Sequence, residues 1–121
     1  MPDPNLLTLL ISALCIVESG NDPNAVGDSG KAVGILQQHK IFVDEVNRII
    51  LIRDNVRNCF SYDDRLDPRR AKLMAQYWFC HHLHEGKSLE ECVRRYNAGK
   101  HWRGKQAESY YLKVKAILDR T

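Results

Sequence analysis

One carboxylate in this chain, Glu18, follows an almost entirely apolar stretch that begins at Leu6. Ser19 and Gly20 come directly after it, and a glycine in this position is typical of the end of a helix. A carboxylate in the last helical turn lies at the negative end of the helix dipole, and apolar neighbours also favour its protonated form. A carboxylic acid that stays protonated near neutral pH can act as a general acid. Glu18 is therefore the first candidate for a catalytic residue, although a solvated glutamate at a frayed helix end would give the same pattern.

Two further segments place polar residues where the apolar pattern of the helices is interrupted. Gln37 closes the segment 34–37, and Tyr96 and Asn97 stand directly before Ala98-Gly99. Amides and a phenol suit the recognition of sugar N-acetyl and hydroxyl groups, because they donate and accept hydrogen bonds beside an aromatic face. Each of these residues alone could also be a turn former or a buried polar group, so their combination has to carry the argument.

The cysteines and histidines offer a second possible chemistry, which is metal binding. The four cysteines contain no CxxC pair and therefore favour neither a zinc ribbon nor a dense disulfide scaffold: Cys15, Cys59, Cys80 and Cys92. On a helix only residues three or four apart share a face, so Cys80 and His84 could pair. His81 and His82 would then point elsewhere, and we expect no metal site. Whether any of the cysteines pair is left open.

The helices that position these residues are indicated by capping residues and by apolar spacing. Asp3-Pro4 can cap and open a first helix that runs to about Ser19. Residues 20–36 are rich in Gly, Asn, Asp and Pro, which predicts a small irregular β-hairpin or an extended loop. Later helices are expected over about residues 42–51, 68–84, 88–95 and 106–118. The predicted fold class is α+β and predominantly helical, with a small β-hairpin between the first two helices.

Length and charge limit the remaining possibilities. The 121 residues suffice for one domain, 1–121, with a core of its own. No apolar run approaches the ~20 residues of a membrane span, and Asp3 and Pro4 stand where a signal peptide would carry basic residues. The formal net charge of +3 suits an acidic polymer such as a cell wall or a nucleic acid. The basic residues lack the interleaved aromatic patch that would favour nucleic acid, so we expect no nucleic-acid partner.

The polar segments occur in an order that resembles the SLT-type, lysozyme-like lytic transglycosylases and the goose-type lysozymes. The matching segments are Glu18-Ser19-Gly20, Asn24-Ala25-Val26, Gly34-x-x-Gln37, Asp67-Pro68, Tyr96-Asn97-Ala98-Gly99 and Glu108-Ser109-x-Tyr111-x-x-Val114. The resemblance implies a lysozyme-like domain with a cleft between the helical body and the hairpin. The family often continues its Gln turn with an isoleucine and a proline, whereas Gln38-His39-Lys40 follow here, so we expect one wall of the cleft to differ.

As the resemblance implies, the activity is that of a peptidoglycan muramidase that cleaves the β-1,4 bond between N-acetylmuramic acid and N-acetylglucosamine. Glu18 would act first as the general acid and then as the base. In a lytic transglycosylase the substrate's own 6-hydroxyl attacks, which gives 1,6-anhydro-muramoyl ends and needs no second carboxylate. The resemblance also implies that no metal or organic cofactor is needed. It assigns contacts with the sugar to Ser19, Gln37, Tyr96, Asn97 and Tyr111.

Two alternatives to a transglycosylase stay open. A hydrolytic lysozyme needs a second carboxylate to position water. Asp28 in the Gly-Asp-Ser-Gly segment is the first candidate for that role, with Asp22 and Asp44 behind it, although Asp28 could equally be a turn residue. The second alternative is a glycan-binding module without catalysis. We expect a monomer that is made in the cytoplasm and reaches the wall after release or delivery, as a phage endolysin does, or a domain cut from a larger exported protein.

Overall fold

The computed structural model describes residues 3–121, which form five α-helices and one two-stranded antiparallel sheet. The helices are α1 (Pro4–Ser19), α2 (Lys40–Asp54), α3 (Pro68–His84), α4 (Leu89–Ala98) and α5 (Lys105–Asp119). The strands β1 (Val26–Gly27) and β2 (Ala32–Val33) lie between the first two helices. This arrangement confirms the predicted α+β fold class with its small hairpin.

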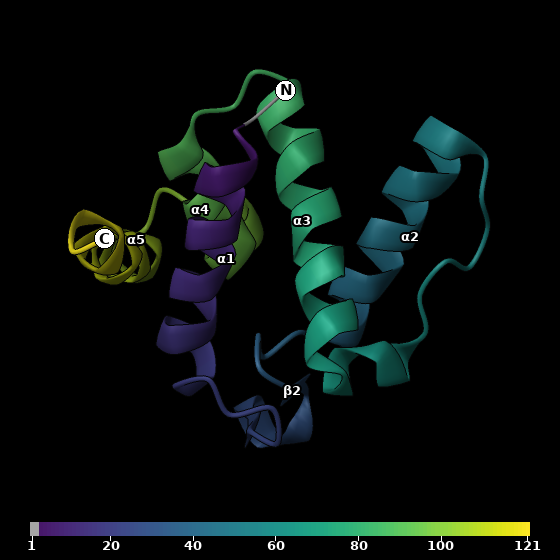
Figure 1. Ribbon diagram of the computed structural model, residues 1–121, viewed down its shortest axis with the longest axis horizontal. Helices are drawn as coiled ribbons and strands as arrows, with labels where there is room; N and C mark the ends of the chain where they lie inside the picture. Colours follow the sequence, from purple (N-terminus) through teal and green to yellow (C-terminus); the bar gives the residue numbers. More distant parts are fainter. Residues whose placement is uncertain (1–2) are drawn as a thin grey trace.

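The helices pack around α1 and α3, which lie side by side at the centre of the molecule (Figure 1). α2 packs on α3, while α5 contacts α1 on the opposite side and also packs against α4. The hairpin lies at the end of the helical body where α1 terminates (Figure 1). The C-terminal turn of α1, which contains Glu18, is thereby brought next to the hairpin.

Both ends of α1 are fixed by the residues that the sequence indicates. The Asp3 side chain accepts a hydrogen bond from the Asn5 backbone N–H, and Pro4 occupies the first turn. Gly20 adopts a left-handed conformation with φ 64°, and its N–H donates to the Ile16 carbonyl. The helix thus ends at Ser19, one residue after Glu18. The apolar positions at helical spacing form its buried face: Leu7, Leu10, Ile11 and Leu14.

The hairpin is tied to the body of the molecule through Gly34. Val26 pairs with Val33 across the two strands, and the Gly34 N–H donates to the Ala25 carbonyl. Gly34 has φ +86°, and a Cβ at this position would lie 1.9 Å from the backbone carbonyl oxygen of Arg65. Only glycine allows this close approach, so the base of the hairpin is held against the 3₁₀ segment Tyr62–Leu66.

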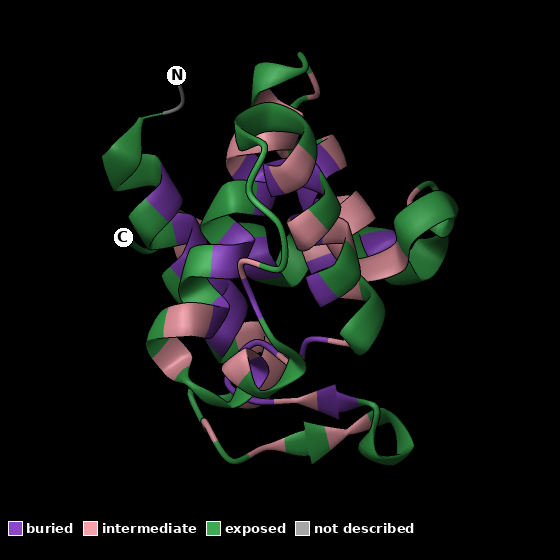
Figure 2. Ribbon diagram, turned by 90° about the vertical axis from the view of Figure 1, so that its right-hand side faces the viewer, coloured by how far each residue is buried: buried purple, intermediate pink, exposed green. Residues whose placement is uncertain are grey.

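The core is built from the inward faces of all five helices, whereas the hairpin is exposed along most of its length (Figure 2). Apolar residues at helical spacing on α2, α3 and α5 are buried: Val43, Val46, Ile49, Ile50, Ala71, Met74, Ala75, Trp78, Tyr110 and Val114. Ile117 and Leu118, which follow the same spacing on α5, are partly buried. Among the described residues, none of the helices combines the length and apolar character needed to cross a bilayer.

The structure differs from the sequence prediction in several places. α2 begins two residues earlier and ends three residues later than expected, at Lys40 and Asp54, and α4 extends three residues further, to Ala98. The segment 54–66 contains the short 3₁₀ helix, which apolar spacing alone does not reveal. Tyr62, an aromatic residue that could anchor this segment to the core, is exposed, and its hydroxyl donates to Asp44. Phe60 provides the anchor in this segment, because it is buried and bonded through its backbone to Asn47.

Candidate active site

A cleft of about 630 Å³ opens between the end of α1, the hairpin, the start of α2 and the end of α4. Five of the residues predicted for the site line it: Glu18, Asp28, Gln37, Tyr96 and Asn97. They come from four separate parts of the chain, and the fold brings them together as the sequence analysis expected. Residues not predicted for the site complete the walls, among them Gln38, His39, Phe42, Glu45, Arg95 and Gln106.

The acid of the cleft, Glu18, is partly buried and held by one strong hydrogen bond. The hydroxyl of Tyr110, from α5, donates to Glu18 Oε2 at 2.9 Å. Burial raises the pKa of Glu18 to about 7, and the hydrogen bond from Tyr110 works in the opposite direction by stabilising the carboxylate. The sequence analysis expected this direction, and the structure attributes it mainly to loss of water around the carboxyl group. Glu18 can therefore both give and take a proton near neutral pH.

Two tyrosines surround Glu18, and both stay neutral. Burial raises the pKa of Tyr110, and the nearby charge of Glu18 raises it further. Burial likewise raises the pKa of Tyr96, with a second contribution from Glu18. The ring of Tyr96 packs edge-on against Phe42 and Trp78, and its buried hydroxyl makes no hydrogen bond within residues 3–121. A neutral phenol without a partner can serve a ligand as donor or acceptor.

The Gln37 side chain joins the cleft to the base of the hairpin. Its Nε2 donates to the carbonyl oxygens of Ala25 at 2.9 Å and Gly34 at 3.0 Å. Its backbone has φ 49°, which is unusual for a residue other than glycine. Because both amide protons are committed to the backbone, Oε1 is the atom of this amide that can meet a ligand.

Asn97 lies on the opposite wall and is held only loosely. Gln106 Nε2 approaches its Oδ1 at 3.5 Å, which is the upper limit for a hydrogen bond. The donors and acceptors of Asn97 and Gln106 therefore remain available to a ligand in the cleft.

Two further carboxylates line the same cleft. Asp28 is exposed at the hairpin, and its Oδ2 lies 3.1 Å from Nε2 of His39. Glu45, on α2, was not predicted for the site and accepts a hydrogen bond from the Trp78 indole at 3.1 Å. The neighbouring His82 ring and the Trp78 N–H hold the pKa of Glu45 below its usual range. Glu45 therefore stays ionised at a pH where Glu18 is half protonated.

Comparison with models of known protein families gave a match over most of the chain. The profile described as the transglycosylase SLT domain matches residues 3–118, which is nearly the whole chain. This chain belongs to the SLT transglycosylase family. Family membership supports lytic transglycosylase activity on peptidoglycan, and it confirms the resemblance seen in the sequence. Comparisons with curated proteins and with solved structures gave no significant match.

Two residues that the resemblance assigned to the sugar do not line the cleft of this SLT domain. The Ser19 hydroxyl donates to the Ile35 carbonyl at 2.7 Å and accepts from the Asp22 N–H, so it braces the loop after α1. Tyr111 packs against the core, with the Arg94 guanidinium 5.9 Å from the centre of its ring. Contact of Ser19 and Tyr111 with substrate remains a prediction for which the geometry offers no support.

The alternative carboxylates Asp22 and Asp44 also lie outside the cleft. Asp22 accepts from the Asn24 N–H in the loop after α1. Asp44 accepts a hydrogen bond from the Tyr62 hydroxyl. Of the three aspartates considered from the sequence, only Asp28 lines the cleft.

The sequence analysis missed Tyr110 and Glu45 as parts of the site of this SLT domain. Tyr110 was not considered for the site, although a buried tyrosine hydroxyl usually has a hydrogen-bond partner. That requirement is the one signal that could have linked it to a buried acid. Glu45 carried no such signal, because it stands among ordinary polar residues of α2 and reaches the cleft only through the angle at which α2 packs.

Proposed function

We propose that this SLT domain is a lytic transglycosylase that cleaves the β-1,4 bond between N-acetylmuramic acid and N-acetylglucosamine, with Glu18 as its acid and base. The observation that carries the proposal is the placement of a partly buried Glu18 on the wall of the cleft, where burial raises its pKa to about 7. A residue that must first donate one proton and then accept another works best when its pKa lies near the ambient pH.

The proposed reaction has two proton transfers at one carboxyl group. Protonated Glu18 donates to the glycosidic oxygen as the bond to the anomeric carbon breaks, and an oxocarbenium-like centre develops on the muramic acid ring. The carboxylate left on Glu18 then takes the proton from the 6-hydroxyl of the same sugar. The oxygen of that hydroxyl forms a bond to the anomeric carbon and closes the 1,6-anhydro ring. The Tyr110 hydroxyl stabilises the carboxylate between the two steps through its hydrogen bond.

The polar atoms left without protein partners indicate where the sugar is held. We propose that Gln37 Oε1 accepts from a sugar hydroxyl or N-acetyl N–H on the hairpin side of the cleft. The hydroxyl of Tyr96 and the amide of Asn97 would bind from the helical side. Polar groups placed to complement the charge that develops stabilise the transition state more than the bound substrate, and an acceptor oxygen suits the positive charge of an oxocarbenium-like centre.

Mass spectrometry of digested peptidoglycan tests this function directly. The expected products end in 1,6-anhydro-muramic acid and are lighter by one water than the products of hydrolysis. Glu18→Gln should abolish digestion, whereas Glu108→Gln, which changes an exposed glutamate of α5 outside the cleft, should leave it unchanged. Products with reducing ends only would refute transglycosylation, and undiminished digestion by Glu18→Gln would refute the role of Glu18.

Hydrolysis is the second candidate, because two further carboxylates face the same cleft. An inverting hydrolase holds its two carboxyl groups ~6.5–9.5 Å apart with a water between them. In that case reducing-end products would appear, and either Asp28→Asn or Glu45→Gln would remove them. For a transglycosylase, the anhydro product should persist in both variants. A glycan-binding module without catalysis would give neither product and would retain binding to insoluble wall.

A further inference from the structure

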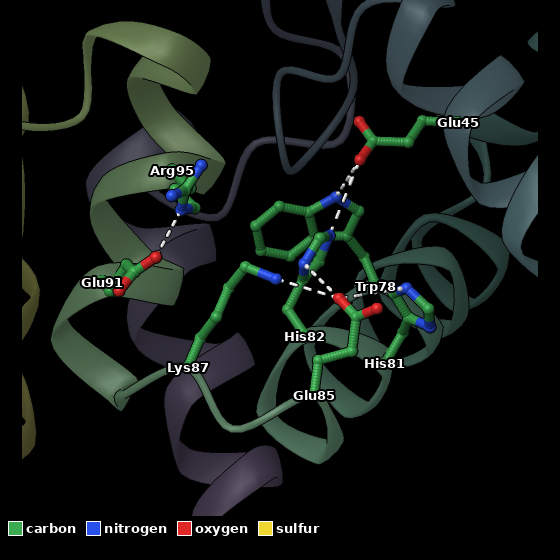
Figure 3. Close-up of polar contacts among 8 residues, drawn as sticks. All are labelled: Glu45, Trp78, His81, His82, Glu85, Lys87, Glu91 and Arg95. Atoms are coloured by element: carbon green, nitrogen blue, oxygen red, sulfur yellow. Dashed lines mark hydrogen bonds and ion pairs between the residues drawn. The ribbon is translucent and has the colours of Figure 1, made fainter.

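A second group of ionisable side chains lies at the C-terminal end of α3, away from Glu18. One Glu85 carboxylate oxygen, Oε1, lies 3.5 Å from His81 Nε2 and 3.7 Å from His82 Nδ1. Figure 3 shows this oxygen between the two imidazoles, with Lys87 approaching from the next loop. The three potential ligand atoms lie within 4.8 Å of one another. We propose that His81, His82 and Glu85 form a binding site for a divalent transition-metal ion of the zinc type.

Two of the three distances between the potential ligand atoms are close to those in a metal coordination sphere, and all three atoms lie within 4.8 Å of one another. Zn²⁺ binds imidazole nitrogen and carboxylate oxygen at ~2.1 Å in tetrahedral geometry, which puts neighbouring ligand atoms about 3.4 Å apart. The distances from Glu85 Oε1 to His81 Nε2 and to His82 Nδ1 are 3.5 and 3.7 Å. Both are close to this separation of ligand atoms and are too long for good hydrogen bonds. Two histidines and one carboxylate would leave the fourth position for water.

The environment of His82 provides an independent argument for a ligand. Its side chain is 14% exposed, and both ring nitrogens are buried without a hydrogen-bond partner among the described residues. Unsatisfied buried nitrogens are costly, and a metal ion on Nδ1 would satisfy one of them.

The other nitrogen of His82 faces the kind of group that supports metal-binding histidines. Nε2 lies 3.6 Å from Oε1 of Glu45, which is fixed in turn by the Trp78 indole (Figure 3). Metal-ligating histidines usually donate their second N–H to a carboxylate, which fixes the tautomer and the orientation of the ring. Glu45 is therefore a positioning residue for the proposed site, and it connects the site to the wall of the cleft.

Lys87 is the residue that opposes metal binding. Its Nζ lies 2.9 Å from Glu85 Oε1, so its positive charge already neutralises the carboxylate that would bind the metal ion. Metal binding must displace this ammonium group, so we expect only moderate affinity in the unmodified chain. Replacing Lys87 with an uncharged residue should strengthen binding.

The sequence argument against a metal site considered only Cys80 and His84 as a pair on one helical face. Those two residues line a different pocket, between α2 and α3. Glu85 was overlooked, although it stands three residues after His82 and four after His81, the two spacings that bring helical side chains together. Imidazole with carboxylate favours Zn²⁺, Co²⁺ or Ni²⁺ over the oxygen-binding ions Mg²⁺ and Ca²⁺.

Calorimetric titration of the full chain with Zn²⁺, in reducing and chelator-free buffer, tests the proposal. One ion per chain should bind, and Mg²⁺ should not compete. Glu85→Gln and His81→Gln should each weaken binding at least ~10-fold, and Glu45→Gln should weaken it by about 10-fold. Lys87→Gln should tighten binding. Titration with Co²⁺ should quench the fluorescence of Trp78, because its ring packs 4.2 Å from that of His82, and should give the visible spectrum of a tetrahedral site.

Two matched variants separate this site from the other metal-binding side chains of α3. His84→Gln removes an exposed histidine from the same helix, and Cys80→Ser removes the neighbouring thiol. Both should leave Zn²⁺ affinity unchanged. Because Glu85 is exposed, Glu85→Gln should keep the fold, which circular dichroism would verify. The absence of micromolar Zn²⁺ binding in the unmodified chain would overturn the proposal. So would an equal loss of affinity in His84→Gln or Cys80→Ser, or unchanged affinity in Glu85→Gln.

Discussion

Replacing Glu18 with glutamine should stabilise the protein at alkaline pH and leave its stability at acidic pH nearly unchanged. Glutamine keeps the size of the side chain and can still accept the hydrogen bond from Tyr110. It removes the ionisation that the partly buried position of Glu18 disfavours. The difference in unfolding free energy between the two proteins therefore reports the cost of ionising a desolvated carboxyl group in the folded state.

The pKa of Glu18 gives the magnitude. In the folded state the pKa lies at about 7, against 4.5 for an exposed glutamate, and each pKa unit corresponds to about 1.4 kcal/mol. Because the folded pKa is raised, the carboxyl contributes its full stability below the unfolded pKa. That contribution is lost as the pH rises from 4.5 through about 7. Above this range the parent protein should be less stable than Glu18→Gln by up to about 3 kcal/mol.

Unfolding by urea, measured for parent and variant near pH 4 and again near pH 8, provides the assay. All other titrating groups are common to the two proteins, so the difference between them reports Glu18. The variant should gain up to about 3 kcal/mol between the two pH values. If the difference in unfolding free energy is the same at both pH values, Glu18 does not carry a raised pKa. The acid–base argument for its role then loses its basis.

Two further predictions concern the partner of Glu18 and the base of the hairpin. Tyr110→Phe removes a hydrogen bond that stabilises the Glu18 carboxylate, so the pKa of Glu18 should rise. The alkaline limb of the pH profile of kcat/KM should therefore move upward by about one pH unit. An unmoved limb would contradict that contact. Gly34→Ala would place a Cβ 1.9 Å from the Arg65 carbonyl oxygen and should lower the unfolding free energy by about 3 kcal/mol or more in urea titration. Gly30→Ala is the control, because φ is also positive at Gly30 but no atom lies near the added Cβ. This variant should lower the unfolding free energy by about 1–2 kcal/mol. A larger loss at Gly30 than at Gly34 would refute the steric argument.

The helices were predictable because their signals are local. The Asp-Pro pairs before α1 and α3, and Ser88 before α4, cap the helices that they precede. Apolar residues at helical spacing then identify the buried faces. The short 3₁₀ helix before α3 has no such periodicity. Its one local signal is the capping box formed by Ser61 and Asp64, which the sequence analysis did not use.

The candidate site was predictable only where a polar residue interrupts a local pattern. Glu18, Gln37 and Asn97 do so, and the structure places all three on the cleft. Glu45 and Tyr110 follow the pattern of their own helices and enter the site through packing between distant segments. Ser19 also interrupts a pattern, but it does so to bond the backbone of Ile35. A broken local rule thus indicates a polar requirement without saying whether that requirement is structural or catalytic.

The contact between α5 and the end of α1 has a consequence for how the protein is made. Glu18 and its partner Tyr110 are separated by 92 positions in the chain, so the first is synthesised long before the second. A nascent chain that has not yet reached Lys105 carries Glu18 without the helix that helps to shield it from water. In that state the carboxyl is more exposed to water, so its pKa is expected to lie below the value of about 7 that burial gives it in the folded protein. Docking of the last helix is therefore expected to complete the environment that keeps a proton on Glu18 near neutral pH.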